Sequence, residues 1–192
     1  LSFQPPAFFE DDGGRFSVER LRDPAELVTT QKSTPPALEL EGHGDGHGLE
    51  LLEQQLHSFN ETDTAIVFVN AKKQCDYVSK QCDLMGFPST VLHSGKTQDQ
   101  RQDSLKGFKD KKYKILVATD VAARGLDIPH VACVINYDFP NGVEDYVHRI
   151  GRTGRAGAKG TAYTFFGQQD AKYARELAQV VRDAGQNVPP EL

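Results

Sequence analysis

The feature that most constrains this chain is a regular alternation of short apolar runs with stretches of helical periodicity, which begins near residue 49. The apolar runs predict five strands, at residues 65–69, 90–92, 115–118, 131–137 and 161–166. Between the first two, Cys75, Val78 and Cys82 recur three and four positions apart, as on one face of a helix. Near-continuous apolar strands that alternate with helices predict an α/β fold, in which helices cover both faces of a parallel sheet.

Helices are predicted before, between and after these strands. Apolar spacing places them around residues 49–56, 75–85, 105–108, 143–147 and 173–184. Gly86 and Pro88 are expected to end the second of them. Ligands of such sheets bind beyond the carboxyl ends of the strands, so the polar residues directly after each strand are the candidates for a functional site.

Residues 1–48 show no sustained periodicity and are interpreted as a flexible, low-complexity extension. Residues 49–192 are interpreted as one domain. The extension contains paired prolines and paired glycines, and it carries nine acidic and four basic residues. The rest of the chain is electrically balanced, and the net charge of −5 argues against indiscriminate binding to nucleic acid. No run approaches the ~18 apolar residues that a membrane span needs, so no membrane partner is expected.

The three cysteines predict a reduced protein. Cys75, Cys82 and Cys133 are odd in number and widely spaced, and the chain contains no Cys-x-x-Cys pair. We therefore expect free thiols and an intracellular environment.

The segment from His148 to Gly157 concentrates positive charge at a fixed spacing. Arg149, Arg152 and Arg155 lie three positions apart, with glycines between them. Like charges at this spacing repel, and the guanidinium is a rigid fork that matches phosphate oxygens. The pattern indicates a site for an incoming anion, and a solvated basic loop is the alternative interpretation.

Carboxylates follow the strand at 115–118, but the chain lacks a loop that would hold a nucleotide. Asp120 and Asp127 are candidates to accept hydrogen bonds from ribose hydroxyls, or they are structural. Gly95-Lys96-Thr97 looks like the end of a phosphate-binding loop, yet Thr90 stands where that motif needs a glycine. A site that hydrolyses phosphate esters of this kind needs both the cations and the loop, so the residues describe half of an active site.

Four motifs, in this order and spacing, resemble the second RecA-like domain of a DEAD-box RNA helicase, and the resemblance covers about residues 49–192. The motifs are residues 66–70, Gln98 with Arg101, residues 117–127, and residues 148–155. Residues 136–146 and 161–166 are similar to a largely nuclear subfamily, which includes the plant helicases with an N-terminal WW domain. The resemblance implies a RecA-like sheet, and a nuclear location with the cytoplasm as the alternative.

The resemblance implies roles on the ATP side of this lobe. Arg152 and Arg155 look like the arginine fingers that reach the γ-phosphate of ATP and act in catalysis. Asp127 is similar to the residue that holds the ribose, with Gly125 close by. His148 and Arg149 resemble residues that couple this site to the partner lobe, and a role limited to packing or hydrogen bonding is the alternative for His148.

On the RNA side, the resemblance implies contacts to the phosphate backbone from Gly95, Arg101 and Thr119. Asn70 and Phe68 belong to the motif that braces this surface, although Phe68 also fits a core position. Ser94 stands where relatives often have glycine. Contacts to phosphate and sugar imply that single-stranded RNA or a short duplex is bound without sequence specificity.

The resemblance also implies what this chain needs from outside. The N-terminal RecA-like lobe would carry the phosphate-binding loop, an adenine-recognising glutamine and the carboxylates that hold Mg²⁺, so no metal ligand is assigned here and the chain alone is expected to be inactive. Residues 1–48 do not resemble the linker or first lobe, and the absence of an initial methionine suggests a fragment. Protein cofactors are possible partners. The alternatives are a stand-alone RNA- or protein-binding module and a lobe of a DNA-directed helicase.

Overall fold

The computed structural model describes residues 47–60, 62–123, 128–129, 131–153, 161–184 and 188. Its centre is a sheet of five strands in the order β2-β3-β1-β4-β5, in which every pairing is parallel. The strands are β1 (Ala65–Phe68), β2 (Ser89–Leu92), β3 (Ile115–Ala118), β4 (Cys133–Asn136) and β5 (Thr161–Thr164). The predicted α/β fold with a parallel sheet is therefore confirmed.

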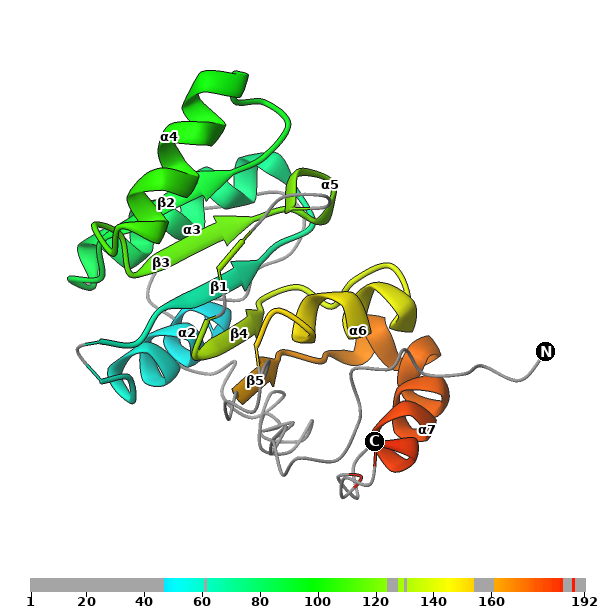
Figure 1. The fold of residues 1–192 in the computed structure, drawn as a ribbon. Helices are drawn as coiled ribbons and strands as arrows, with labels where there is room; N and C mark the ends of the chain where they lie inside the picture. Colours follow the sequence, from blue (N-terminus) through cyan, green and yellow to red (C-terminus); the bar gives the residue numbers. More distant parts are fainter. Residues whose placement is uncertain are drawn as a thin grey trace.

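In the part of the chain that the structure describes, seven helical elements accompany the strands (Figure 1). They are α2 (His47–His57), α3 (Lys72–Leu84), α4 (Gln98–Lys109), α5 (Asp120–Ala123), α6 (Val143–Ile150), the 3₁₀ helix η3 (Gln168–Tyr173) and α7 (Ala174–Asp183). The predicted helices correspond to α2, α3, α4, α6 and α7. The short elements α5 and η3 are not predicted, because four and six residues are too few to show an apolar period.

Helices cover both faces of the sheet, and the alternation of side chains along the strands explains how. Ile66 and Phe68 of β1 belong to a buried cluster with apolar side chains of α4, α6 and α7. Ala65 and Val67 point to the other face, where they pack with side chains of α2 and α3. Successive side chains of a strand point to opposite faces, so a wholly apolar strand needs a cover on each.

Local sequence signals set the ends of two helices. Thr97 accepts a hydrogen bond from the amide of Gln100, whose side chain accepts from the amide of Thr97, and this capping box begins α4. After α3, Gly86 has a φ of +86°, a conformation that favours glycine, and the chain turns into β2. The predicted stop at Gly86 is thus confirmed.

Among the described residues, no helix is long and apolar enough to cross a bilayer. No group of three or more potential metal-ligating side chains occurs in the same part of the chain.

The three thiols give a test of this fold. All three cysteines are free and buried, as expected, and burial raises the pKa of Cys75 and Cys82 to about 12 and that of Cys133 further. Because only the thiolate reacts readily, we expect the native chain to resist a chromogenic thiol reagent at about pH 8 and the denatured chain to react at all three cysteines. The absorbance of the chromophore that the reagent releases measures the number of reacted thiols.

The substitution Leu84→Cys supplies the control, because the Leu84 side chain is 71% exposed on α3. The added thiol should react at once in the native state. Rapid native reaction of the original cysteines would contradict the burial described.

Candidate functional site

The carboxyl ends of the parallel strands bring segments from distant parts of the sequence to one edge. Asn70 lies just beyond β1, Thr119 and Asp120 follow β3, and Asp138 follows β4. The turn at residues 93–96 follows β2. This is the edge at which such sheets bind ligands, and it carries several of the residues predicted to act.

Arg149, on α6, is the central side chain of this edge, and it is 2% exposed. Its Nε and Nη2 donate to the two carboxylate oxygens of Asp120, at 2.7 Å and 2.6 Å. Nη2 also donates to Oδ1 of Asn70 at 2.8 Å, and Nη1 donates to the carbonyl of Asp138 at 2.7 Å and to Oδ1 of Asn136 at 3.5 Å. All five guanidinium donors therefore have acceptors, which a buried charge requires.

The Arg149 network ties most of the sheet together. It joins segments at the ends of β1, β3 and β4 to α6, and Asn136 extends it to β5 by donating to Oγ1 of Thr164 at 3.0 Å. The guanidinium carbon also lies 5.1 Å from the ring centre of Phe68, within reach of a cation–π interaction. Phe68 is thus a core residue and a neighbour of the site at once.

This geometry corrects two expectations. Arg149 does not wait for an external anion, because the Asp120 carboxylate already offsets its charge inside the lobe. Asp120 is correspondingly engaged by Arg149 and is not an open acceptor for ribose hydroxyls. The coupling role of Arg149 stays a prediction, and a buried side chain can exert it only through the residues it holds.

Arg152 follows α6 after one intervening residue, Gly151, and is half-buried. Its amide donates to the carbonyl of Arg149 at 3.1 Å, and its carbonyl accepts from the amide of Val131 at 3.4 Å. The next residue, Thr153, is buried and donates its hydroxyl to the carbonyl of Val131 at 2.6 Å. The backbone of Arg152 is therefore fixed on both sides.

The other predicted residues on the ATP side fall into two groups. Arg155, Gly125 and Asp127 lie outside the described residues. His148 lies on the outward side of α6, with 59% of its side chain exposed and Nε2 3.9 Å from Oε1 of Glu144, one turn earlier. This exposure rules out a buried packing role for His148 within the lobe.

On the RNA side, Arg101 and Thr119 lie close together through α5. Nη2 of Arg101 donates to the carbonyl of Ala122 at 3.1 Å, and Nη1 donates to Oε1 of Gln98 at 3.2 Å. The carbonyl of Thr119 accepts from the amides of Ala122 and Ala123 and so begins α5. The Nε atom of Arg101 is buried and finds no acceptor among the described residues.

Gly95 differs from the expectation of a donor that is ready for RNA. Its amide donates to Nδ1 of His93 at 3.1 Å, inside the lobe. The predicted contact to RNA therefore requires that this bond be given up. Thr119 is also largely buried, at 7% exposed.

Comparison with known proteins places this architecture. The family described as the helicase conserved C-terminal domain matches residues 48–157, more than half of the chain. The chain belongs to the helicase conserved C-terminal domain family.

Relatives of this helicase domain are DEAD-box proteins. It is 54% identical over 127 residues to DEAD-box ATP-dependent RNA helicase 30 of Arabidopsis thaliana, which covers 66% of this chain and 22% of the relative. It is 43% identical over 185 residues to DEAD-box ATP-dependent RNA helicase 46 of the same plant, and this match covers 93% of this chain and 28% of the relative. The chain thus spans about a quarter of these relatives. The second match covers enough of this chain to extend into residues 1–48.

Solved structures agree with the fold of the helicase domain. The RNA helicase Prp28 from Chaetomium thermophilum, bound to ADP, matches with a TM-score of 0.69 and 42% identity over 78% of this chain and 37% of that chain. The C-terminal domain of the DEAD-box protein Dbp5 matches with a TM-score of 0.63 and 29% identity, over 74% of this chain and 81% of that chain. The predicted RecA-like fold is confirmed.

Some residues of the helicase domain's site were missed as site residues by sequence reasoning. Asp138 accepts from the amide of Asn70 at 2.7 Å and from Nε2 of Gln74 at 3.0 Å. Asp76 holds the turn after β2 from the neighbouring helix α3. Asp138 directly follows a predicted strand, so the expectation that ligands bind beyond the carboxyl ends of strands could have identified it. No local sequence pattern identifies Asp76 as a site residue.

The Arg149 network predicts a strong effect of Arg149→Lys on stability. Lysine keeps the charge but cannot supply five donors in a plane, so buried acceptors are left unpaired. We expect the free energy of unfolding of the chain to fall by about 3 kcal/mol, as when a buried ion pair is broken. Urea unfolding measures it.

Arg182→Lys is the matched control, because Arg182 is exposed near the end of α7. Its effect should stay within about 0.5 kcal/mol, as for a typical surface change. Equal effects of the two substitutions would contradict the central position given to Arg149.

Proposed function

We propose that this domain is the C-terminal lobe of an ATP-dependent RNA helicase, which couples ATP hydrolysis to the unwinding of RNA duplexes or the remodelling of RNA–protein complexes. The observation that carries the proposal is the placement of Arg152. It follows, after Gly151, the helix that Arg149 clamps to the strand ends, and its backbone is fixed by Arg149 and Val131. A cation on a backbone held in this way suits a developing phosphate charge.

The roles of the two sides follow from this arrangement. ATP and RNA would bind across two lobes, and closure would bring Arg152, with Arg155, to the γ-phosphate. Arginine fingers of this kind contribute roughly 10³–10⁵ to the rate. Arg101, Thr119 and Gly95 would contact the RNA backbone, so recognition would depend little on base sequence.

ATP and Mg²⁺ fit this lobe only as half of a site. Arg152 is the cation that we assign to the phosphate oxygens, and Asp120, the carboxylate that begins α5, is engaged by Arg149. We therefore assign the Mg²⁺ ligands and the phosphate-binding loop to the N-terminal RecA-like lobe. A coding sequence that lacks such a lobe upstream would favour the stand-alone binding module instead.

We also propose a nuclear location, with the cytoplasm as the alternative. Support comes from the similarity of residues 136–146 and 161–166 to a largely nuclear subfamily, and from the high identity to plant DEAD-box helicases. We expect a fluorescent fusion of the complete protein to accumulate in the nucleus under the microscope. Exclusion from the nucleus would contradict the proposal.

Arg152→Lys tests the finger assignment. In the complete protein we expect RNA-stimulated ATP hydrolysis to fall about a thousandfold, because lysine lacks the planar fork, while the affinity for RNA changes much less. Phosphate release measures the first quantity, and fluorescence anisotropy of a labelled single-stranded RNA measures the second.

The control for Arg152→Lys is again Arg182→Lys, which should leave turnover unchanged. The 192-residue chain by itself should release no phosphate above background. Normal turnover in Arg152→Lys, or hydrolysis by the isolated chain, would count against the proposed function, and stronger stimulation by DNA than by RNA would remove the RNA assignment.

A further inference from the structure

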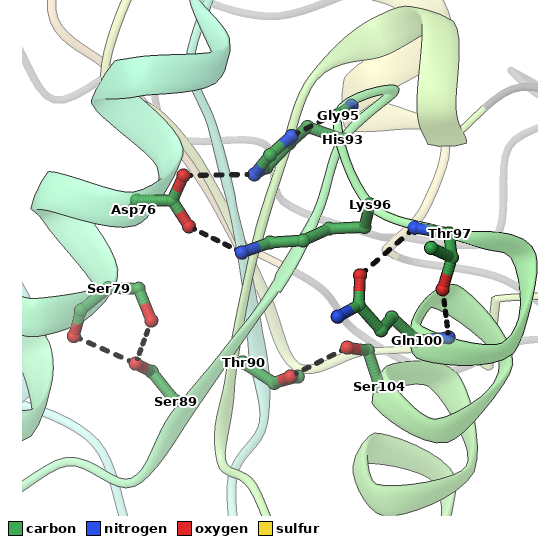
Figure 2. Close-up of polar contacts among 10 residues, drawn as sticks. All are labelled: Asp76, Ser79, Ser89, Thr90, His93, Gly95, Lys96, Thr97, Gln100 and Ser104. Atoms are coloured by element: carbon green, nitrogen blue, oxygen red, sulfur yellow. Dashed lines mark hydrogen bonds and ion pairs between the residues drawn. The ribbon is translucent and has the colours of Figure 1, made fainter.

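The turn that follows β2 is held by one carboxylate from the neighbouring helix. Asp76, on α3, accepts from Nε2 of His93 at 3.1 Å and from Nζ of Lys96 at 2.8 Å (Figure 2). The amide of Lys96 also donates to the carbonyl of His93 at 3.1 Å. Both ends of the turn are therefore tied to the same side chain.

The hydrogen bonds of His93 assign its tautomer. Nδ1 accepts from the amide of Gly95 at 3.1 Å, so this nitrogen carries no proton. Nε2 then carries the proton and donates to Asp76. The imidazole is neutral in this arrangement, and the residue is 4% exposed.

Glycine is needed at position 95 for this contact. A Cβ on Gly95 would lie 3.0 Å from Nδ1 of His93, closer than side chains normally approach. Gly95 is nonetheless an exposed residue. The amide can therefore serve either the imidazole within the lobe or an acceptor outside it.

The turn adjoins the other two predicted contacts to RNA. The amide of Thr119 donates to the carbonyl of Leu92, directly before the turn, at 3.2 Å. The amide of Arg101 donates to the carbonyl of Thr97, directly after the turn, at 3.0 Å. A change in the turn thus acts within the predicted RNA surface.

A carboxylate and two lysines lie around His93. Partial burial acts to raise the pKa of Asp76, but the hydrogen bonds from Lys96 and His93 outweigh burial and lower it, so Asp76 stays ionised near neutral pH. Lys96 faces the same carboxylate, and the stem of Lys72 lies beside Gly95. Cys75 stays neutral, because burial raises the pKa of its thiol to about 12.

We propose that His93 is a positioning residue for RNA binding: its neutral imidazole keeps the Gly95 amide inside the lobe, and its protonation against Asp76 releases that amide to an RNA phosphate. A protonated Nδ1 is a donor and can no longer accept from Gly95, while Nε2 keeps its bond to Asp76. The proton comes from solvent. The proposal rests on the proposed function, in that Gly95 contacts the RNA backbone.

The tautomer can be tested in the 192-residue chain without RNA. A ¹⁵N correlation spectrum of the imidazole groups should show an unprotonated Nδ1 and a protonated Nε2 for His93 at about pH 8. The amide proton of Gly95 should shift as His93 gains its second proton on acidification. A proton on Nδ1 at about pH 8 would overturn the proposal, whatever the protein does with RNA.

Two isosteric variants separate the two bonds of the imidazole in the complete protein. His93→Gln keeps a donor for Asp76 and removes the acceptor for Gly95, whereas His93→Asn keeps an acceptor near the Nδ1 position and loses the bond to Asp76. We expect His93→Gln to lower the RNA concentration that half-saturates ATP hydrolysis about threefold at about pH 8, and His93→Asn to leave it unchanged or higher.

The pH profile is the decisive readout, because a purely structural role would not produce it. Between about pH 8 and pH 6, the half-saturating RNA concentration of the original protein should fall, since histidine commonly changes charge in this range. Both variants should flatten this profile. Equal weakening by both variants with an unchanged profile would overturn the proposal in favour of simple structural support.

Asp76→Asn tests the other end of the relay. Loss of the negative charge disfavours the imidazolium, so the midpoint of the pH profile should move to lower pH. Asp103→Asn on α4 removes an equal charge from an exposed side chain and should leave the midpoint unchanged. If the original protein shows no RNA-stimulated hydrolysis, the proposed function is wrong. If it does hydrolyse ATP and Asp76→Asn leaves the midpoint of the pH profile unchanged, only the role proposed for His93 is wrong.

Discussion

The ion pair between Arg149 and Asp120 is the interaction on which the site depends. An arginine that is 2% exposed has lost its hydration, and only a complete set of acceptors offsets that cost. The acceptors come from the ends of three strands, so the charge can be satisfied only when those strands are in register. The pair is therefore better understood as a device that specifies the arrangement of the edge than as a source of stability.

That arrangement fixes the surroundings of two groups. Arg152 follows the clamped helix with its backbone fixed, and Arg101 reaches the carbonyl of Ala122 on the element that Asp120 begins. Asp120 thus belongs both to the Arg149 network and to the short helix that Arg101 contacts. Through Asp120, the two sides are joined by hydrogen-bonded groups of the described structure.

The fold was within reach of the sequence, and the site only in part. Apolar runs and helical spacing predicted the five strands and the long helices, because burial on two faces leaves a local imprint on each element. The single turn α5 and the 3₁₀ helix η3 left no such imprint. The similarity of the motifs to those of DEAD-box helicases identified Arg101, Thr119, Arg149 and Arg152 as candidates. The hydrogen-bond partners of Arg149, Gly95 and His93 could not be predicted from local patterns.

The sequence by itself determined the order of strands and helices along the chain and the position of the polar segments at the carboxyl ends of the strands. It also determined membership of the helicase C-terminal domain family. Only the tertiary structure decided which of the arginines is buried. Arg149 and Arg152 look equivalent in the repeat, yet one is buried against Asp120 and the other is half-exposed. The reason is physical: a side chain's partners come from segments up to 79 positions away along the chain, and only packing brings those segments together.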